Sequence, residues 1–339
     1  MDHHITNKQP LLNELGHLNE PGFALKEVFE YSRKMIKASK WRIKEWDYYA
    51  CLNEDFVFAF TVADLGYLGM CTATYLDLTT GKETKKTIMT PFPFGRYGLP
   101  ETSKKGNFDI SKKKYSFKFL LENNKRILDV RIKDFVKGKD LTALLTLEQP
   151  KDDIMLIATP WKEKPKAFYY NQKINCMPTS GSVTLGDKEF IYDKEKDFSV
   201  LDWGRGVWTY KNTWYWGSMS TLVDGKRFGF NIGYGFGDTS KATENMLFYD
   251  GKAHKLNDVE FIINKENFMK PWKFESSDDR LSLVMTPLLD RVDNTNLLII
   301  KNFGHQVFGK FNGFVVLDDG TKLEIIDKLG FAEEIINQY

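Results

Sequence analysis

An aspartate followed three residues later by an arginine, in a segment dense in tryptophan, is the part of the sequence best suited to chemistry. Residues 201–220 read LDWGRGVWTYKNTWYWGSMS and hold four of the eight tryptophans. Asp202 could be a general acid, because burial in an apolar pocket raises the pKa of a carboxyl group until it keeps its proton near neutral pH. Indole and phenol rings could then stabilise a cationic intermediate through their electron-rich faces. The alternative is an ion pair between Asp202 and Arg205 that fixes a glycine-rich bend.

The aromatic side chains around Asp202 are candidates for the walls of a ligand pocket. Val207–Tyr210 and Thr213–Trp216 predict a hairpin that turns at Lys211-Asn212, because asparagine tolerates the left-handed backbone of a tight turn. Alternation along the strands places large rings on both faces of this hairpin. Each large ring hides about 150–250 Å² when buried, so we expect one face to line a core or a cavity. The predicted ligand-binding residues are Trp203, Trp208, Trp214, Trp216, Tyr67, Tyr215 and Trp46.

Four further polar residues outside this segment could contribute to a site. Asp64 precedes Leu65-Gly66 and could either orient a ligand or begin a turn. His305 lies among apolar and glycine residues and could be a base or a hydrogen-bonded core imidazole. Glu45 and Asp47 share one face of a strand, either as solvent-exposed charges or as a pair of catalytic carboxylates. The predicted catalytic residues are Asp202, Arg205, Asp64 and His305.

Several classes of chemistry and partner are not indicated by the sequence. No His/Cys pair has metal-ligand spacing, and no glycine-rich phosphate loop follows a strand and opens a helix, so we expect neither a metal nor another cofactor. The formal net charge of +2 provides no overall field to attract nucleic acid.

The cysteines and the apolar runs indicate the compartment. The first residues lack the basic and apolar regions of a signal peptide. No run approaches the roughly eighteen apolar residues of a membrane span. Cys51, Cys71 and Cys176 have no paired spacing, which is typical of a reducing environment. We therefore expect a cytoplasmic protein without an integral membrane segment, and we predict no particular oligomeric state.

The elements that must position these residues are strands. Tyr115, Phe117, Phe119 and Leu121 are spaced two residues apart and form one face of a strand. Asp-Gly pairs at 224–225, 250–251 and 319–320 predict tight hairpin turns. Apolar residues in Leu25–Lys40 predict one short helix. The fold class is therefore all-β: antiparallel strands that form barrels, preceded by a short N-terminal helix.

Two weakly similar halves indicate two β-barrels in tandem. Each half begins with a charged and aromatic strand and ends in clean two-residue alternation, as Lys44–Tyr49 and the segment from Asp202 onward illustrate. We predict an N-terminal barrel domain with an N-terminal extension over residues 1–170, and a C-terminal barrel domain over residues 171–339.

Six segments resemble a bacterial family known as domain of unknown function 2804. They are LLNELGHLNEPGFA (Leu11–Ala24), KEWDYY (Lys44–Tyr49), ADLGYLG (Ala63–Gly69), LDWGRGVW (Leu201–Trp208), WYWGS (Trp214–Ser218) and GHQVFGKFNG (Gly304–Gly313). More remotely, the chain is similar to two-domain lipocalin-like (calycin) proteins such as carotenoid 1,2-hydratases, tocopherol cyclases and fungal Diels–Alderases. The resemblance implies an apolar ligand held in or between two barrels and an acid that can protonate it. The hydratases open their second half with a W-x-D-type segment; Asp202 corresponds to its acid, although Arg205 and Gly206 depart from that pattern.

Three functions are compatible with these observations. The first is a cofactor-free hydratase, isomerase or cyclase that acts by acid catalysis on a hydrophobic small molecule or lipid. The second is a non-catalytic, lipocalin-like carrier of a hydrophobic ligand in the same cavity. The third is a structural or partner-binding β protein whose aromatic side chains only fill cores.

Overall fold

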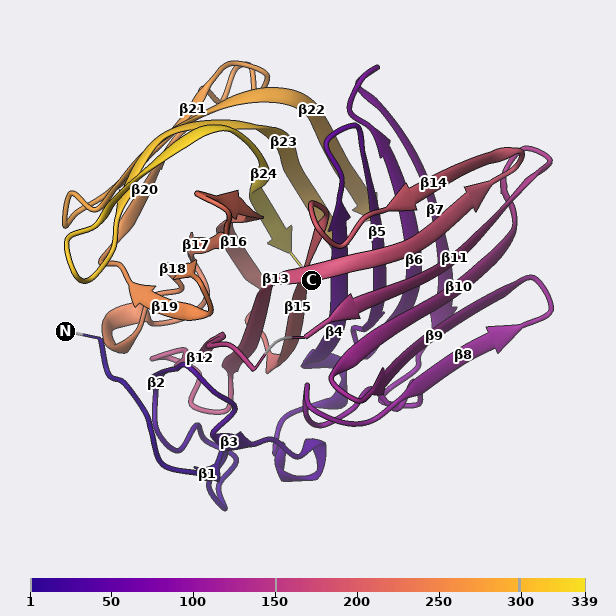
Figure 1. Ribbon diagram of the computed structural model, residues 1–339. Helices are drawn as coiled ribbons and strands as arrows, with labels where there is room; N and C mark the ends of the chain where they lie inside the picture. Colours follow the sequence, from indigo (N-terminus) through magenta and orange to yellow (C-terminus); the bar gives the residue numbers. More distant parts are fainter. Residues whose placement is uncertain (1, 150, 298–299, 339) are drawn as a thin grey trace.

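Two curled antiparallel sheets lie against each other in the computed structural model, which describes residues 2–149, 151–297 and 300–338 (Figure 1). The first sheet has thirteen strands and the second has nine. The N-terminal segment adds a small parallel pair, β1 (Gln9–Pro10) with β3 (Phe29–Glu30). The prediction of an all-β protein with two tandem antiparallel barrels is confirmed, and each sheet forms a curled half-barrel.

The first sheet is built from the N-terminal part of the chain. In sheet order its main strands are β7 (Lys82–Pro91), β6 (Leu68–Asp77), β5 (Phe56–Asp64), β4 (Ile43–Leu52), β15 (Phe198–Val207), β13 (Phe168–Leu185), β11 (Lys139–Glu148), β10 (Lys125–Val136), β9 (Tyr115–Glu122) and β8 (Phe108–Lys112). Three more strands extend it beside β13, namely β2 (Gly22–Ala24), β12 (Met155–Pro160) and β14 (Lys188–Tyr192).

The second sheet contains the C-terminal strands. In sheet order they are β19 (Lys252–Lys255), β18 (Met246–Tyr249), β17 (Lys226–Tyr234), β16 (Lys211–Val223), β24 (Lys322–Gln338), β23 (Ile300–Val316), β22 (Leu281–Leu297), β21 (Trp272–Ser276) and β20 (Val259–Ile262). Within the described part of the chain, the helical elements are three short 3-10 turns: η1 (Arg33–Met35), η2 (Lys40–Arg42) and η3 (Thr239–Lys241).

Alternation and turn chemistry form the hairpins as predicted. In β10, Leu128, Val130 and Ile132 are buried, and the residues between them face outward. The three Asp-Gly turns join β16 to β17, β18 to β19 and β23 to β24. Asp224 and Asp250 have φ values of 51° and 50°, the left-handed region that such turns require.

The predicted helix over Leu25–Lys40 is wrong. This segment contains β3 and η1 and is otherwise irregular. Val28, Phe29 and Tyr31 are all buried in the core of the first half-barrel. Three side chains so close in sequence cannot all face the core from a single helical stripe, because residues one or two apart point in different directions on a helix.

The predicted hairpin around Lys211-Asn212 is also wrong. Strand β15 ends at Val207 in the first sheet, whereas β16 begins at Lys211 in the second sheet and pairs with β17 and β24. The segment between them crosses from one sheet to the other. Asn212 closes this crossing by donating from Nδ2 to the Thr209 carbonyl at 2.7 Å. Trp208 and Trp216 are buried in the clusters between the two sheets and Trp214 is partly buried there, whereas Tyr210 is exposed.

The chain passes from the first sheet to the second between β15 and β16. The predicted domain boundary between residues 170 and 171 lies earlier, inside β13, which is a strand of the first sheet. Strand β13 bends at Cys176, whose φ is 59°. Before the bend it pairs with β12 and β15, and after the bend it pairs with β11 and β14. The division of the chain into two domains stays a prediction.

Apolar side chains fill three regions: the inside of each half-barrel and the layer between the two sheets, here called the inter-sheet layer. Strand β15 contributes to two of them, because its side chains alternate. Trp203 belongs to the core of the first half-barrel, and Asp202, its neighbour, points into the inter-sheet layer, where Lys173 contacts it.

Candidate active site

Asp202 is buried in the inter-sheet layer and is held by two side chains from the neighbouring strand β13. The Lys173 ammonium lies 2.9 Å from its Oδ2, and Asn171 Nδ2 donates to its Oδ1 at 2.6 Å. Residues 171 and 173 share a face of β13, which directly pairs with β15, so the register places both donors beside residue 202. One carboxyl oxygen therefore accepts a hydrogen bond, and the other contacts the ammonium group.

Arg205 faces the opposite way, into the first half-barrel. Its Nη2 lies 3.0 Å from Asp47 Oδ1, and its guanidinium stacks 3.9 Å from the ring centroid of Trp203. Further bonds reach the carbonyl oxygens of Trp46 and Pro100. The ion pair between Asp202 and Arg205 considered from the sequence is thus replaced by two separate pairs on opposite sides of one strand.

The second sheet covers Lys173 with an indole. Lys173 Nζ lies 3.7 Å from the ring centroid of Trp216, close enough for a cation–π interaction. Trp216 Nε1 donates to Asn231 Oδ1 at 2.6 Å, which fixes the ring against the lysine. The carboxylate and the indole face together compensate the positive charge of the buried ammonium group.

Glu333 on β24 is the carboxyl group of this layer with neutral hydrogen-bond partners. Trp214 Nε1 donates to its Oε1 at 3.0 Å, and Gln306 Nε2 donates to its Oε2 at 2.9 Å. Burial raises the pKa of Glu333 to about 7; the Trp214 hydrogen bond and the charge of Lys173 lower it, and the charge of Asp202 raises it. Glu333 can therefore exchange a proton near neutral pH, which is what general acid–base catalysis requires.

Gln306 connects Glu333 to a cation on the rim of the layer. Arg291 Nη1 donates to Gln306 Oε1 at 2.9 Å, and the Tyr48 hydroxyl lies 3.4 Å from the same oxygen. The amide thus has its oxygen toward the arginine and its nitrogen toward Glu333. Burial raises the pKa of Tyr48, so its hydroxyl stays protonated.

Glu244 is a further buried carboxyl group close to the same layer. Among the described residues, neither of its oxygens has a partner at hydrogen-bonding geometry. Burial raises the pKa of Glu244, while the charge of Lys173 and the nearby Tyr169 hydroxyl lower it. Glu244, Glu333 and Asp202 thus share the field of Lys173.

Aromatic rings separate this polar cluster from a pocket at the edge of the layer. Trp208 packs edge-on against Trp214 at 5.4 Å and against Trp46 at 5.3 Å between ring centroids. Phe236 stacks on Tyr169 at 4.2 Å and completes the group. The pocket has a volume of about 370 Å³ and is lined by His17, Ala38, Arg42, Lys164, Pro165, Lys166, Ala167, Val207, Trp208 and Thr209. Its volume lies in the usual range of small-molecule sites.

The remaining predicted residues lie outside this cluster. Asp64 accepts from the backbone N–H groups of Gly66 at 2.9 Å and Gly95 at 2.6 Å, so it ties a turn to the loop that follows β7. His305 stacks on Phe268 at 3.6 Å and bonds Asp290 Oδ2 through Nδ1 at 2.7 Å. The His305 and Asp290 side chains are both partly buried.

Two predicted aromatic residues also lie elsewhere. The Tyr67 ring lies 4.3 Å from the Lys44 ammonium near the β5–β6 turn. Tyr215 stacks on Tyr234 at 4.5 Å and donates its hydroxyl hydrogen to Glu334 at 2.7 Å, toward the core of the second half-barrel.

The expectation that Glu45 and Asp47 are solvent-exposed is wrong. Both are buried inside the first half-barrel. Glu45 accepts from the Tyr31 hydroxyl at 2.7 Å and forms an ion pair with Arg33, and Asp47 pairs with Arg205. Alternation correctly places them on one face, but the distant arginines that neutralise them cannot be read from the local sequence.

Sequence reasoning missed Lys173, Glu244 and Glu333. Lys173 is the only charged residue in YYNQKINC (169–176), and Glu333 lies in FAEEII (331–336). A charged residue inside a strand that is buried on both faces is unusual, because an unpaired buried charge is costly. That signal could have identified Lys173 and Glu333; Glu244, in a turn-rich segment, gives no such signal.

Across residues 2–149, 151–297 and 300–338, no group of three or more His, Cys, Asp or Glu side chains is placed to hold a metal ion. In the same ranges, no helix has both the length and the apolar character needed to span a bilayer. Cys51, Cys71 and Cys176 are buried free thiols.

Three solved structures share the architecture. A protein of Nitrosomonas europaea provisionally described as ATTH is 15% identical, with a TM-score of 0.54 over 90% of this chain and 96% of that one. CghA, solved with Sch210972, is 10% identical, with a TM-score of 0.51 over 97% of each chain. Kievitone hydratase from Nectria haematococca is 11% identical, with a TM-score of 0.50 over 98% of this chain and 96% of that one. At these identities the likeness establishes the fold alone, two curled antiparallel half-barrel sheets of the lipocalin-like kind.

Sequence comparison gives the family. No functionally curated protein matches the chain. The family model described as domain of unknown function (DUF2804) matches residues 2–339. The resemblance noted in the sequence is thereby confirmed, and the chain belongs to the DUF2804 family.

Proposed function

We propose that this protein is a cofactor-free enzyme of the hydratase, isomerase or cyclase type, which transfers a proton to or from an apolar small molecule or lipid. The observation that carries the proposal is Glu333: a carboxyl group with a pKa of about 7, between an indole N–H and an amide, in a layer walled by aromatic rings. Such a group is half protonated near neutral pH and can act as acid or base. That a hydratase shares the fold is compatible with this proposal.

In this proposal Glu333, and not Asp202, transfers the proton. One oxygen of Asp202 accepts a hydrogen bond from Asn171 and the other forms an ion pair with Lys173, so protonation of the carboxylate would weaken one of these contacts. Asp202 instead holds Lys173 in place. The pair and the rings of Trp214 and Trp216 would then stabilise charge that develops on the substrate.

The pocket at Trp208 is the proposed entrance. Its wall, Trp208, contacts Trp214, and Trp214 donates to Glu333. An apolar ligand that displaces the Trp208 ring would meet Trp214 next and come within reach of the Glu333 carboxyl group. The substrate then lies between the two sheets and not inside either half-barrel.

A carrier is the second candidate, and the same pocket favours it. The rings of Trp208 and Trp214 lie between the pocket and Glu333, so a ligand can bind at the pocket without any contact with the acid. The third interpretation, aromatic side chains that only fill cores, provides no role for a pocket of about 370 Å³ lined by Trp208.

Deuterium incorporation separates the enzyme from the carrier. The freshly purified full-length protein is analysed by native mass spectrometry for a bound apolar molecule, and the complex is then incubated in D₂O. We expect deuterium at carbon in the bound molecule or its product. Glu333→Gln should keep binding and slow the exchange by about 10²–10⁴-fold, the usual effect of losing a positioned general acid.

Glu334→Gln is the matched control, because residue 334 lies on the same strand but faces the second half-barrel. It should leave the exchange unchanged. Bound ligand without deuterium uptake in the unaltered protein would establish the carrier instead. Equal exchange in the unaltered protein and in Glu333→Gln would exclude Glu333 as the acid.

A further inference from the structure

Three exposed or half-exposed rings gather at the end of the first half-barrel, and they are called the aromatic knob here: Trp41, Phe92 and Phe94. Trp41 is 51% exposed and Phe92 is 50% exposed. Trp41 lies 5.7 Å from Phe92 and 5.0 Å from Phe94 between ring centroids, and the two phenylalanines are stacked. A contiguous patch of exposed apolar rings marks an interaction surface, whereas single exposed apolar residues are common on any protein surface.

The backbone holds the two phenylalanines in this position at a cost. Phe92 and Phe94 have φ values of 52° and 48°, a region that bulky side chains rarely occupy. The Phe92 and Phe94 N–H groups donate to the carbonyl oxygens of Tyr67 and Gly66, at 2.9 and 3.2 Å. Asp64 anchors the same loop through Gly95. The strained backbone holds these rings in solvent, where they gain little packing energy. Such strain indicates a role in binding.

Basic residues are concentrated in the two segments that carry the aromatic knob. Residues 33–42 and 92–100 contain six lysines and arginines, of which Arg33 pairs with the buried Glu45; Glu101, the next residue, accepts from the Arg33 N–H group. Lys40 Nζ lies 4.3 Å from the ring centroid of Phe94, directly beside the knob. Lys164 and Lys166 line the neighbouring pocket. Exposed lysines are depleted in the centres of protein–protein interfaces, whereas they are attracted to anionic lipid headgroups.

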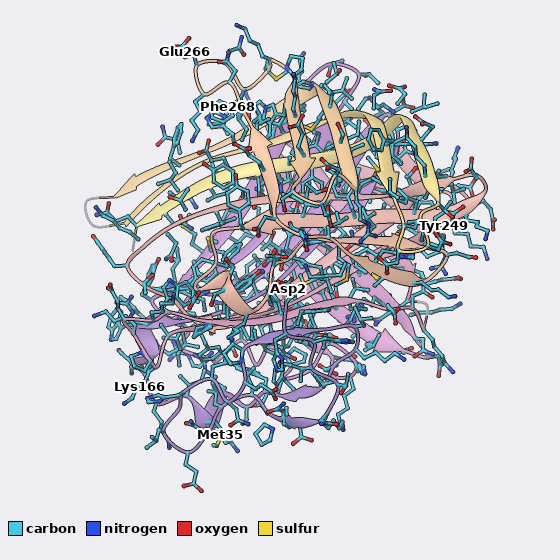
Figure 2. All side chains as sticks on the ribbon, turned by 90° about the vertical axis from the view of Figure 1, so that its left-hand side faces the viewer. Asp2, Met35, Lys166, Tyr249, Glu266 and Phe268 are labelled. Atoms are coloured by element: carbon cyan, nitrogen blue, oxygen red, sulfur yellow. The ribbon has the colours of Figure 1, made fainter. Side chains whose placement is uncertain are left out.

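The aromatic knob adjoins the pocket at Trp208. Arg42, the next residue after Trp41, lines that pocket and donates from Nε to the Trp208 carbonyl at 2.9 Å. Figure 2 shows Met35 and Lys166 at the same end of the molecule. Rings, cations and pocket mouth therefore occupy one end of the protein.

We propose that this end docks on an anionic lipid surface. Trp41 and Phe92 insert among the headgroups, and the lysines bind the negative charges of the lipid surface. Tryptophan favours the interface between headgroups and acyl chains, and basic residues add attraction within a Debye length. The pocket mouth then faces the bilayer, so that an apolar ligand passes into the protein without crossing water. This last step rests on the proposed function; the docking itself does not.

Vesicle co-sedimentation with the full chain tests the docking without any ligand. We expect binding to phosphatidylcholine vesicles that contain phosphatidylglycerol, weaker binding to phosphatidylcholine alone, and loss of binding in high salt. Trp41→Ser with Phe92→Ser should weaken binding about tenfold or more, because the interfacial anchors are lost. Both side chains are exposed, so the fold should be kept, which circular dichroism checks.

Leu144→Ser with Ile191→Ser is the matched control. These side chains are 61% and 66% exposed on β11 and β14, outside the basic end, and their loss should leave vesicle binding unchanged. Absence of binding by the unaltered protein overturns the proposal, and so does equal binding by the Trp41/Phe92 variant. Equal losses in both double variants also overturn it, because the anchors would then be unspecific.

Transfer of an apolar probe separates this inference from the proposed function. Diphenylhexatriene in phosphatidylglycerol vesicles should reach the protein faster than it reaches the Trp41/Phe92 variant. Glu333→Gln should bind vesicles and take up the probe like the unaltered protein. If Glu333→Gln and the unaltered protein exchange deuterium equally while docking persists, only the proposed function fails. If docking is absent while deuterium exchange depends on Glu333, only the docking fails.

Discussion

Inside the first half-barrel Glu45 and Asp47 are each paired with an arginine, whereas the inter-sheet layer pairs Asp202 with Lys173 but also buries Glu333, whose hydrogen-bond partners are uncharged. Inside the half-barrel, Asp47 has a guanidinium at 3.0 Å, and Glu45 has both an arginine and a tyrosine hydroxyl. In the inter-sheet layer, Glu333 has an indole and an amide, both uncharged. Burial raises the pKa of Asp47 as well, yet there the direct Arg205 contact opposes it.

This difference teaches which buried acids serve structure and which can serve chemistry. An acid locked to its own cation is fixed in charge and geometry, so it joins strands and loops. An acid held by neutral donors is left close to its titration point, where a small change of surroundings moves its proton. Arg205, which also bonds the Pro100 carbonyl, is an example of the first role, and Glu333 of the second.

The largest expected effect is on the stability of the first region. Arg205→Met removes a fully buried cation and leaves Asp47 without its partner. Loss of one member of a buried pair typically costs about 3–5 kcal/mol, so the free energy of unfolding should fall by that order. Chemical denaturation measures it.

Arg131→Met is the control for that change. Arg131 also pairs with an aspartate, Asp129, but its side chain is mostly exposed, so the variant should lose less than about 1 kcal/mol. Similar losses in both variants would remove the distinction between a locked pair and a surface pair.

The second effect is on the pH dependence of folding stability, and it arises from Glu333 in the inter-sheet layer. The folded pKa of Glu333, about 7, lies above its usual value of 4.5. The folded state therefore binds the proton more tightly, and its stability should be full below pH 4.5 and decrease as pH rises towards 7. Glu333→Gln should flatten this decrease by at most about 3.5 kcal/mol, since each pKa unit corresponds to about 1.4 kcal/mol.

Unfolding curves at a series of pH values between 4 and 8, an interval of about four units, measure this slope. Glu334→Gln should keep the slope, because Glu333 is still present. A slope that persists in Glu333→Gln would assign it to other groups, such as Glu244, whose pKa is also raised by burial.

The smallest effect separates two indoles of the same layer. Trp214→Phe keeps the ring beside Trp208 but removes the N–H that Glu333 accepts, which should raise the pKa of Glu333 by about one unit or less. The midpoint of the stability decrease reports the shift. Trp216→Phe removes an N–H donated to Asn231 and should leave that midpoint in place. A shift of the same size in both variants would mean that ring shape, and not the hydrogen bond, sets this pKa.

Local sequence determined the strands and several turns of this protein. Side-chain alternation in β10 and the Asp-Gly turns depend on neighbouring residues alone, and both were predicted correctly. The dense tryptophans of 201–220 likewise pointed to the layer in which Trp214 and Trp216 lie.

Tertiary structure decided what the charged residues contact. Asp202 pairs with Lys173 and Arg205 with Asp47 because β15 has β13 on one side and β4 on the other, with alternate side chains facing different layers. Glu333 reaches Trp214 only because β24, the last strand, pairs with β16 more than a hundred residues earlier. Alternation shows that a side chain faces one side of a sheet, but strand order decides what lies there, and burial against that partner sets the pKa on which the chemistry depends.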